Sequence, residues 1–330
     1  MKHVNYYELT AKDNYGLGLQ RGELFGDVAR RTLARKKHSK YWQKKIELSK
    51  DYLNETEKHF PLLVDELEGY AKASNISFQE FWTMSLEDDF DYLEAEKCTT
   101  VVTNNGKLIS HNEDWEVGMQ DVICILKKTL QNVTTFELFY YNTLGGASIC
   151  VNSYGYVMTI NTLTHTDRQI GVPRNVIARW LSETKNVEKD FEKLTTIKRS
   201  LGYNHIFANT KGMIWDLECS ATQQKLLKPQ VPYVHTNHFT ASELKRFEEN
   251  DGSTGTFERY DAACELVKPR MTVEEMTILN SNKSKDNKES IMNERTIGKM
   301  IIDLEKNIAN VWLKREEEKG WIAYNLDFIK

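Results

Sequence analysis

The hydrophobic pattern of this chain changes its period at Cys98. From about Leu17 to Glu96, apolar residues such as Leu63 and Leu67 recur every three or four positions, which is typical of amphipathic helices. From Cys98 onward, CTTVVT and KLISH alternate with period two around the Asn-Gly pair at 105–106, which favours a tight hairpin turn. The pattern predicts a helical segment followed by a sheet that begins at the cysteine.

Further strand and helix signals follow in blocks. VICILKKTL is expected to pair with TTFELFYYN, and ASICVNS with YVMTINTL; residues 173–181 and 190–199 should be helical. A second set of strands is predicted in HIFANT, GMIWDLEC, QQKLLKP and VPYVHTNHF, and a strand pair in RTIGKMIIDLEKNIANVWL. Helices are expected at 257–267 and after Thr272/Glu275, whose capping-box pattern also occurs at Ser77/Glu80. Such blocks predict an α+β layered sandwich with mainly antiparallel sheets.

The charge balance argues against nucleic-acid and membrane partners. The formal net charge is -4, so no overall field would attract the chain to polyanions. The first residues, MKHVNYYELTAKDNYG, lack an apolar run, and no segment has the roughly 20 apolar residues that span a bilayer. We expect a cytoplasmic protein with a small-molecule role.

Two local patterns have ordinary structural explanations. Gly16, Gly18 and Gly22 loosely mimic a dinucleotide fingerprint without a βαβ unit around them, so a turn or helix-packing role is predicted. A basic cluster is expected to form a solvated helix face. It comprises Arg30, Arg31, Arg35, Lys36, Lys37, Lys40, Lys44 and Lys45.

Five cysteines lie far apart without any CxxC pair, which argues against a disulfide framework and a zinc site. At most one or two of these thiols should be functional.

The string EKCTTVVTNNGKLISHNEDW resembles the acyl-coenzyme A:isopenicillin N acyltransferase family of autoproteolytic Ntn (N-terminal nucleophile) hydrolases, which cut linear amide C–N bonds. FPLLVDELEGYAKASNIS resembles the family's segment before its cleavage site, and VNSYGYVMTINTL, GVPRNVIARWL and VHTNHF resemble later blocks. The resemblance covers most of the chain from about Pro61 onward.

This resemblance implies a four-layer αββα sandwich and self-cleavage between Lys97 and Cys98. Residues 1–97 would become a small helical chain that stays packed on the core, and 98–330 would form the Ntn-hydrolase core. A thiol is only partly ionised at neutral pH, and a freed α-amine, with a typical pKa of about 7.7–8.0, would supply a base on the same residue. Cys98 would then attack the carbonyl of a small-molecule amide or acyl thioester.

The resemblance also assigns further site residues. Asp114 in NEDW matches the family's acidic position, and Asn237 in HTNH matches an asparagine that stabilises the tetrahedral oxyanion. Arg295 corresponds to an arginine near the site, and Asn161 in TINTL is a candidate substrate contact. No bound cofactor or metal is implied, although acyl-coenzyme A is a candidate co-substrate and a homo-oligomer a candidate assembly.

Two alternatives stay open. In the first, the chain remains uncut and Cys98 works as a thiol hydrolase with His235 or His238 as its base. In the second, an unprocessed member of the fold with an intact Lys97–Cys98 bond acts as a binding protein.

Overall fold

A computed structural model describes residues 2–86, 89–90, 97–141, 143–249, 255–285 and 289–330. The end of the predicted helical region before Cys98 lies outside these residues.

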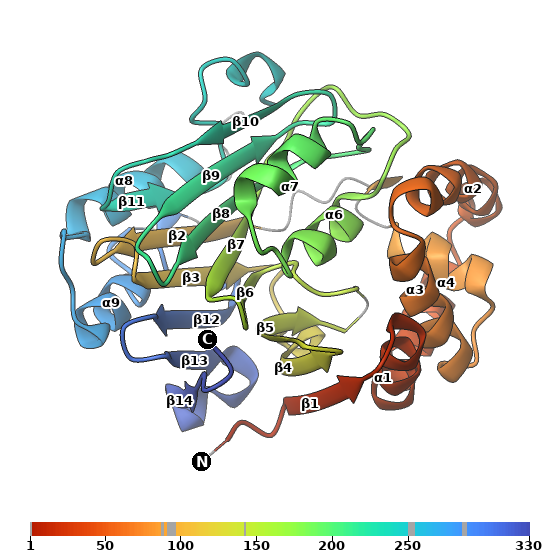
Figure 1. Ribbon diagram of the computed structural model, residues 1–330, viewed down its shortest axis with the longest axis horizontal. Helices are drawn as coiled ribbons and strands as arrows, with labels where there is room; N and C mark the ends of the chain where they lie inside the picture. The colour runs from red at the N-terminus through yellow and green to blue at the C-terminus, as the bar shows by residue number, and fades with distance from the viewer. Residues whose placement is uncertain (1, 87–88, 91–96, 142, 250–254, 286–288) are drawn as a thin grey trace.

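The described part of the N-terminal segment contains one strand and the four helices named below, at the right and lower edge of Figure 1. They are β1 (Tyr6–Ala11), α1 (Asn14–Lys36), α2 (Trp42–His59), α3 (Pro61–Ala73) and α4 (Phe78–Ser85). Helices α1 and α3 approach so closely that a Cβ on Gly18 would overlap the carbonyl oxygen of Glu66. The predicted helix-packing role of this glycine is therefore confirmed.

The first sheet has eight strands and contains a strand of the N-terminal segment. Its order is β1, β4 (Ile123–Leu130), β5 (Val133–Tyr140), β6 (Ile149–Asn152), β7 (Tyr156–Thr162), β8 (Tyr203–Asn209), β9 (Ile214–Cys219) and β10 (Gln224–Leu227). Strand β1 pairs parallel with β4, and the other neighbours are antiparallel.

The second sheet has six strands. The first of them in the sequence begins at Lys97 and contains Cys98, where the sequence predicts a sheet to begin. Its order is β11 (Tyr233–His235), β2 (Lys97–Thr103), β3 (Leu108–Asp114), β12 (Thr296–Asp303), β13 (Ile308–Leu313) and β14 (Ile322–Asn325). All of its neighbours are antiparallel. The turn between β2 and β3 has positive φ at both Asn105 and Gly106, as the sequence predicts.

Three hydrophobic cores separate the layers of helices and strands. One lies between the first sheet and helices that include α1, α3, α6 (Arg174–Leu181) and α7 (Val187–Leu194). A second joins the two sheets face to face, and a third packs α8 (Thr256–Leu266) and α9 (Val273–Asn280) on the second sheet. The α+β class with two mainly antiparallel sheets is thus confirmed.

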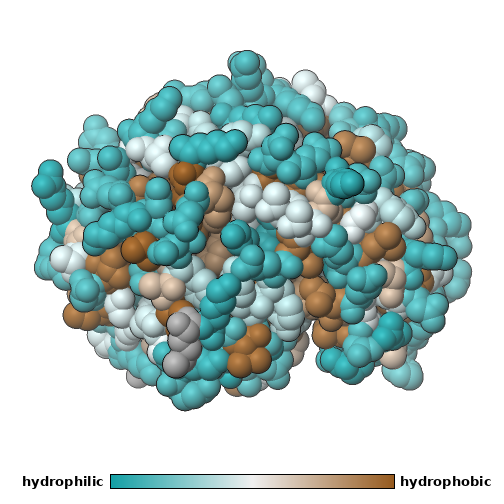
Figure 2. Space-filling view, turned by 60° about the horizontal axis from the view of Figure 1, so that its bottom comes forward, coloured by the Kyte–Doolittle hydropathy of each residue, from teal (hydrophilic) through white to brown (hydrophobic). Residues whose placement is uncertain are grey.

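The surface in Figure 2 is mostly hydrophilic, with apolar residues in small scattered groups and a notch at the lower edge beside the right-hand part. Short 3-10 helices η1 (Gln120–Val122), η2 (Lys245–Phe247) and η4 (Lys314–Lys319) complete the described elements. Among the described residues, no helix is long and apolar enough to cross a bilayer.

Three local expectations differ from the structure. Strand β1 was not predicted; its alternation is visible only at its end, where Leu9 and Ala11 are buried. The helix expected at 190–199 is α7, which begins at Val187 because Asn186 caps it, and ends at Leu194. The Ser77 hydroxyl donates to the Glu80 carboxylate (2.9 Å) and makes no bond to the backbone, so only the Thr272/Glu275 capping box forms.

Candidate active site around Cys98

Cys98 is almost fully buried, with 1% of its surface exposed, and lies on β2 opposite Glu113 of β3. Directly opposed residues of antiparallel strands present their side chains to the same face. The Cys98 Sγ accordingly lies 3.7 Å from the Glu113 Oε1. The thiol and this carboxylate form the centre of the site.

A row of polar side chains continues from Glu113 along the same face. The Glu113 Oε1 accepts a hydrogen bond from the Tyr140 hydroxyl (2.8 Å), and the Glu113 Oε2 lies 3.0 Å from the His111 Nε2. The His111 Nδ1 is 2.9 Å from the Thr100 Oγ1. Because every second residue of a strand faces the same side, positions 98 and 100 and positions 111 and 113 together build this row.

Asn161 stands at the far end of the row, on β7 of the other sheet. The Thr100 hydroxyl donates to its Oδ1 (2.9 Å), and its Nδ2 donates to the His235 carbonyl (3.4 Å). These bonds connect the two sheets behind the thiol. Asn161 therefore contacts Thr100 and the backbone at His235.

Asn237 lies directly against the backbone of the cysteine, in the loop after β11. Its Oδ1 accepts hydrogen bonds from the Cys98 backbone N–H (3.0 Å) and from the Arg259 Nη2 (2.8 Å), and its Nδ2 donates to the Thr162 carbonyl (3.0 Å). Two donors facing the oxygen fix the orientation of the amide. The structure thus brings Asn237 to the Cys98 nitrogen.

Arg259 of α8 is a site residue that the sequence did not reveal. Its Nη1 donates to the Cys98 carbonyl (2.7 Å) and to the Thr99 Oγ1 (2.9 Å). Burial lowers the pKa of Arg259, while the nearby Asp114 charge acts in the opposite direction. Arg259 lies three and four residues before the buried Ala262 and Ala263, so the three residues share one face of α8. This spacing is the sequence signal that could have indicated an inward-facing guanidinium.

Asp114 lies one position beyond Glu113, opposite Lys97 in the strand register. Its two oxygens accept hydrogen bonds from the Thr296 hydroxyl (2.6 Å) and the Asn293 amide (3.2 Å). Burial raises the pKa of Asp114, although the Arg259 charge and these two hydrogen bonds oppose the rise. Thr296 and Asn293 thus hold this carboxyl group in place.

Arg295 lies near the same end of the sheet. Its carbonyl accepts a hydrogen bond from the Trp115 backbone N–H (2.9 Å), and its positive charge helps to lower the pKa of Arg259. The structure thus places the predicted arginine in the surroundings of the site.

The two candidate histidine bases have other surroundings. The His235 Nδ1 lies 2.8 Å from the Thr236 carbonyl and its Nε2 lies 3.2 Å from the Glu218 Oε1, so both ring nitrogens are engaged. Burial by itself lowers the pKa of His235, but the carboxylates of Glu218 and Asp216 outweigh it and raise the pKa.

The His238 ring packs against Phe257 and Tyr260, with centroids 4.6 and 5.3 Å away. Burial lowers the pKa of His238 to about 4.

Among the described residues, two groups of side chains have the donor atoms and spacing that a metal ion requires. Cys98, His111 and Glu113 offer sulfur, nitrogen and oxygen donors within 4.8 Å of one another, a set that Zn²⁺ accepts. The second group, Asp216, Glu218 and His235, is equally compact. Protein donors already occupy its carboxylates, among them the Thr240 hydroxyl and backbone N–H.

A family model described as acyl-coenzyme A:6-aminopenicillanic acid acyl-transferase matches residues 101–318. The beta-alanyl-dopamine/carcinine hydrolase of Drosophila melanogaster is 25% identical over 215 residues, which are 56% of each chain. The match thus spans about half the length of that curated relative.

Solved structures with a similar fold include penicillin V acylase from Agrobacterium tumefaciens, with a TM-score of 0.45 and 12% identity over 66% of this chain and 83% of that one. A mutant of the conjugated bile acid hydrolase from Clostridium perfringens has a TM-score of 0.44 and 13% identity over 71% and 93% of the respective chains.

Proposed function

The chain belongs to the acyl-coenzyme A:6-aminopenicillanic acid acyl-transferase family, and we propose that it is a self-processing amidohydrolase or acyltransferase with Cys98 as its N-terminal nucleophile. The observation that carries this proposal is the hydrogen bond from the Cys98 backbone N–H to the Asn237 Oδ1 (3.0 Å). A side chain distant in sequence thereby holds the nitrogen that cleavage would release.

Self-cleavage would begin with the Cys98 thiol, 3.7 Å from the Glu113 carboxylate, which can accept its proton. The sulfur attacks the Lys97 carbonyl carbon, the C–N bond breaks, and the Cys98 nitrogen takes up a proton and leaves as an amine. Water then hydrolyses the Lys97 thioester. The products are a Lys97 carboxylate and a Cys98 residue with a free amine and a free thiol.

In turnover, the new amine would act as the base for the thiol. Asn237 would hold the amine through its Oδ1, and the buried Arg259 guanidinium, bonded to the same oxygen, would favour the uncharged form of the amine. A neutral amine can accept the thiol proton and later pass it to the leaving group. Arg259 is therefore a positioning residue in this proposal.

The predicted roles of the other residues remain part of the proposal. Asp114 would balance the charge of Arg259, and that of the amine after it has accepted the thiol proton, while Arg295 and Asn161 support the ends of the site. Asn237 would also donate to the oxyanion once its Nδ2 leaves the Thr162 carbonyl. The positions of the three cores support the four-layer Ntn-hydrolase sandwich as part of the proposal. The division at 97/98 rests on the family resemblance, and the first core contains residues from both sides of it.

The family supports a substrate class for this proposal. The acyl-enzyme on Cys98 would form from a small-molecule amide or an acyl thioester such as acyl-coenzyme A. Water completes hydrolysis, whereas an amine completes acyl transfer. The Drosophila relative is named for the hydrolysis of beta-alanyl-dopamine and carcinine, and these two compounds belong in a first screen.

A second candidate keeps the chain uncut. The contacts of Cys98 with Glu113, and of Glu113 with His111, would supply a thiol, a carboxylate and an imidazole without cleavage. It differs from the alternative in which His235 or His238 is the base; both ring nitrogens of His235 lie close to other groups. A binding protein without catalysis remains the third candidate.

Trapping the acyl-enzyme tests the proposal. The protein is incubated with a panel of p-nitroanilides and acyl thioesters, quenched in acid and digested, and the acylated peptide is mapped by mass spectrometry. We expect an acyl group on the sulfur of a peptide that begins at Cys98, and normal labelling in Cys264→Ala, which alters an exposed thiol. Acylation of Cys98 within an uncut peptide favours the second candidate, and turnover without a Cys98 adduct contradicts both mechanisms.

A further inference from the structure

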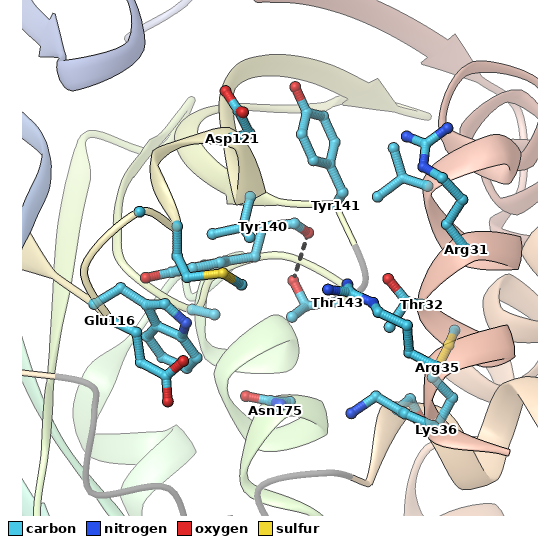
Figure 3. Close-up of a pocket in the computed structure, with 18 of the residues that line it drawn as sticks. Arg31, Thr32, Arg35, Lys36, Glu116, Asp121, Tyr140, Tyr141, Thr143 and Asn175 are labelled. Carbon is cyan, nitrogen blue, oxygen red and sulfur yellow. Dashed lines mark hydrogen bonds between the residues drawn. The ribbon is translucent and has the colours of Figure 1, made fainter. Parts of the chain in front are cut away.

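A pocket of about 640 Å³ lies next to the Cys98 site (Figure 3). Tyr140 lines it, and the Tyr140 hydroxyl donates to the Glu113 Oε1, which in turn lies 3.7 Å from the Cys98 Sγ. Trp115, another lining residue, directly follows Asp114 in the chain. Tyr140 and Glu113 thus connect the pocket wall to the Cys98 thiol.

One wall of the pocket is a cationic face of α1. The lining residues Val28, Arg31, Thr32, Arg35 and Lys36 recur at helical spacing and therefore share one side of the helix. Figure 3 shows the two arginines and the lysine on the same side of the pocket. Arg31 and Arg35 are exposed and Lys36 is half-buried, so this face is solvated, as the sequence predicts, while it also borders the pocket.

Two cations of this wall, Arg31 and Arg35, carry charges that no described residue balances. Neither the Arg31 nor the Arg35 side chain forms an ion pair or hydrogen bond with another described residue. Like charges four residues apart on a helix repel each other by about 0.2–0.5 kcal/mol. An anion bound between these arginines would remove that repulsion.

Acidic residues on the opposite side offset the wall only in part. Glu116 and Asp121 line the pocket there, as Figure 3 shows. Asp121 is strongly exposed and lies 4.0 Å from the Arg315 Nε, so its charge already has a partner. The remaining balance on the pocket walls is positive.

Aromatic rings provide the rest of the binding surface. Trp115 and Tyr140 lie with their ring centroids 5.5 Å apart, and Tyr203 lines the pocket as well. Such rings bind flat apolar groups through contact area and offset stacking.

We infer that this pocket binds a carboxylate-bearing aromatic or apolar group of the substrate, with Arg31 and Arg35 as specificity-determining residues. That the bound group belongs to a substrate rests on the proposed function. Binding of the ligand itself does not require catalysis. Because α1 belongs to residues 1–97, the N-terminal fragment would contribute directly to substrate choice. The cationic wall would also disfavour a substrate whose corresponding group is an ammonium.

Isothermal titration calorimetry with two ligands of similar shape tests the inference. Phenylacetate carries the carboxylate, and 2-phenylethanol is its neutral, non-hydrolysable counterpart. We expect wild-type protein to bind phenylacetate about tenfold more tightly, since charge-assisted and bidentate hydrogen bonds from arginine are about twice as strong as neutral ones. The double variant Arg31→Gln/Arg35→Gln should bind the two ligands with about equal affinity, because its affinity for phenylacetate falls while its affinity for 2-phenylethanol stays unchanged.

A charge-matched control is Lys44→Gln/Lys72→Gln, which removes two positive charges from residues of α2 and α3 that do not line the pocket. It should keep the tenfold preference. Equal binding of the two ligands by wild-type protein, or an equal loss of preference in the control, would overturn the inference. Phenylacetate binding by a protein that neither cuts itself nor turns over amides would contradict only the proposed function, and an active, processed enzyme without a carboxylate preference would contradict only this inference.

Discussion

At the scale of single residues, Asn237 distinguishes the N-terminal amine mechanism from a histidine-based one. Its Oδ1 holds the Cys98 nitrogen, whereas the His238 ring packs against Phe257 and Tyr260. Removing Asn237 would deprive the amine of its acceptor and the oxyanion of a donor.

We expect Asn237→Ala to lower kcat by about 10²–10³-fold with a smaller change in KM, because the lost interactions act chiefly in the transition state. His238→Ala should change kcat far less. Both constants are measured on the best amide from the screen, after mass spectrometry has confirmed cleavage of each variant. A collapse of kcat in His238→Ala together with near-normal Asn237→Ala would reverse the assignment.

A buried histidine outside the site gives a pH prediction. Burial, assisted by the Arg199 charge, lowers the pKa of His205 to about 3, so the folded protein keeps the ring neutral where the unfolded chain binds a proton. The contribution of the neutral His205 ring to the free energy of unfolding is therefore fully present above pH 6.5 and is lost as the pH falls toward 3.

His205→Phe, between Tyr203 and Phe207 on β8, should gain stability relative to the wild type by up to about 1.4 kcal/mol per pH unit below 6.5. Urea unfolding at pH 7, 6, 5 and 4 measures the difference. A difference that does not depend on pH would show that His205 takes up its proton in the folded state.

The sequence was sufficient to locate Cys98, Asp114 and Asn237 near one another, because each lies in a string that resembles the family. Glu113 could also have been found, since the hairpin turn at 105–106 already pairs residue 98 with residue 113. Arg259 was hidden because its contacts cross from α8 to β2, and an arginine on a short helix ordinarily predicts an exposed position.

At the scale of elements, the close contact between α1 and α3 depends on glycine. A methyl group at position 18 would overlap backbone atoms of α3, which cannot move as a flexible side chain can. We expect Gly18→Ala to lower the free energy of unfolding by about 3 kcal/mol or more. Gly16→Ala in the same helix would meet only the Asp13 side chain and should change the value by less than about 1 kcal/mol. Chemical denaturation of both variants measures this, and equal effects would contradict the packing argument.

Elements with strong local patterns were predicted well, and those fixed by distant contacts were not. The pair β12 and β13 follows from alternation and a short turn within one string. Strand β1 is defined by pairing with β4, more than 100 residues away, so its short sequence carries little signal of its own.

At the scale of the whole molecule, residues 1–97 are built into the rest of the fold. Strand β1 extends the eight-stranded sheet, and Glu66 of α3 forms a fully buried ion pair with Arg179 of α6 (3.1 Å). Breaking such a pair leaves an uncompensated buried charge, which costs about 3–5 kcal/mol.

A cut chain should therefore stay together under native conditions. We expect size-exclusion chromatography to give one peak that contains both fragments, and separation only in denaturant. Loss of the small fragment from native, freshly cut protein would contradict this role of β1 and α3.

The most direct test of the central claim is the intact mass of purified, denatured protein. The uncut chain has a mass of 38.4 kDa. Self-cleavage before Cys98 predicts two species of about 11 and 27 kDa, the larger beginning with cysteine, and a single full-length species in Cys98→Ala. A catalytically active wild-type protein that remains at 38.4 kDa would contradict the account.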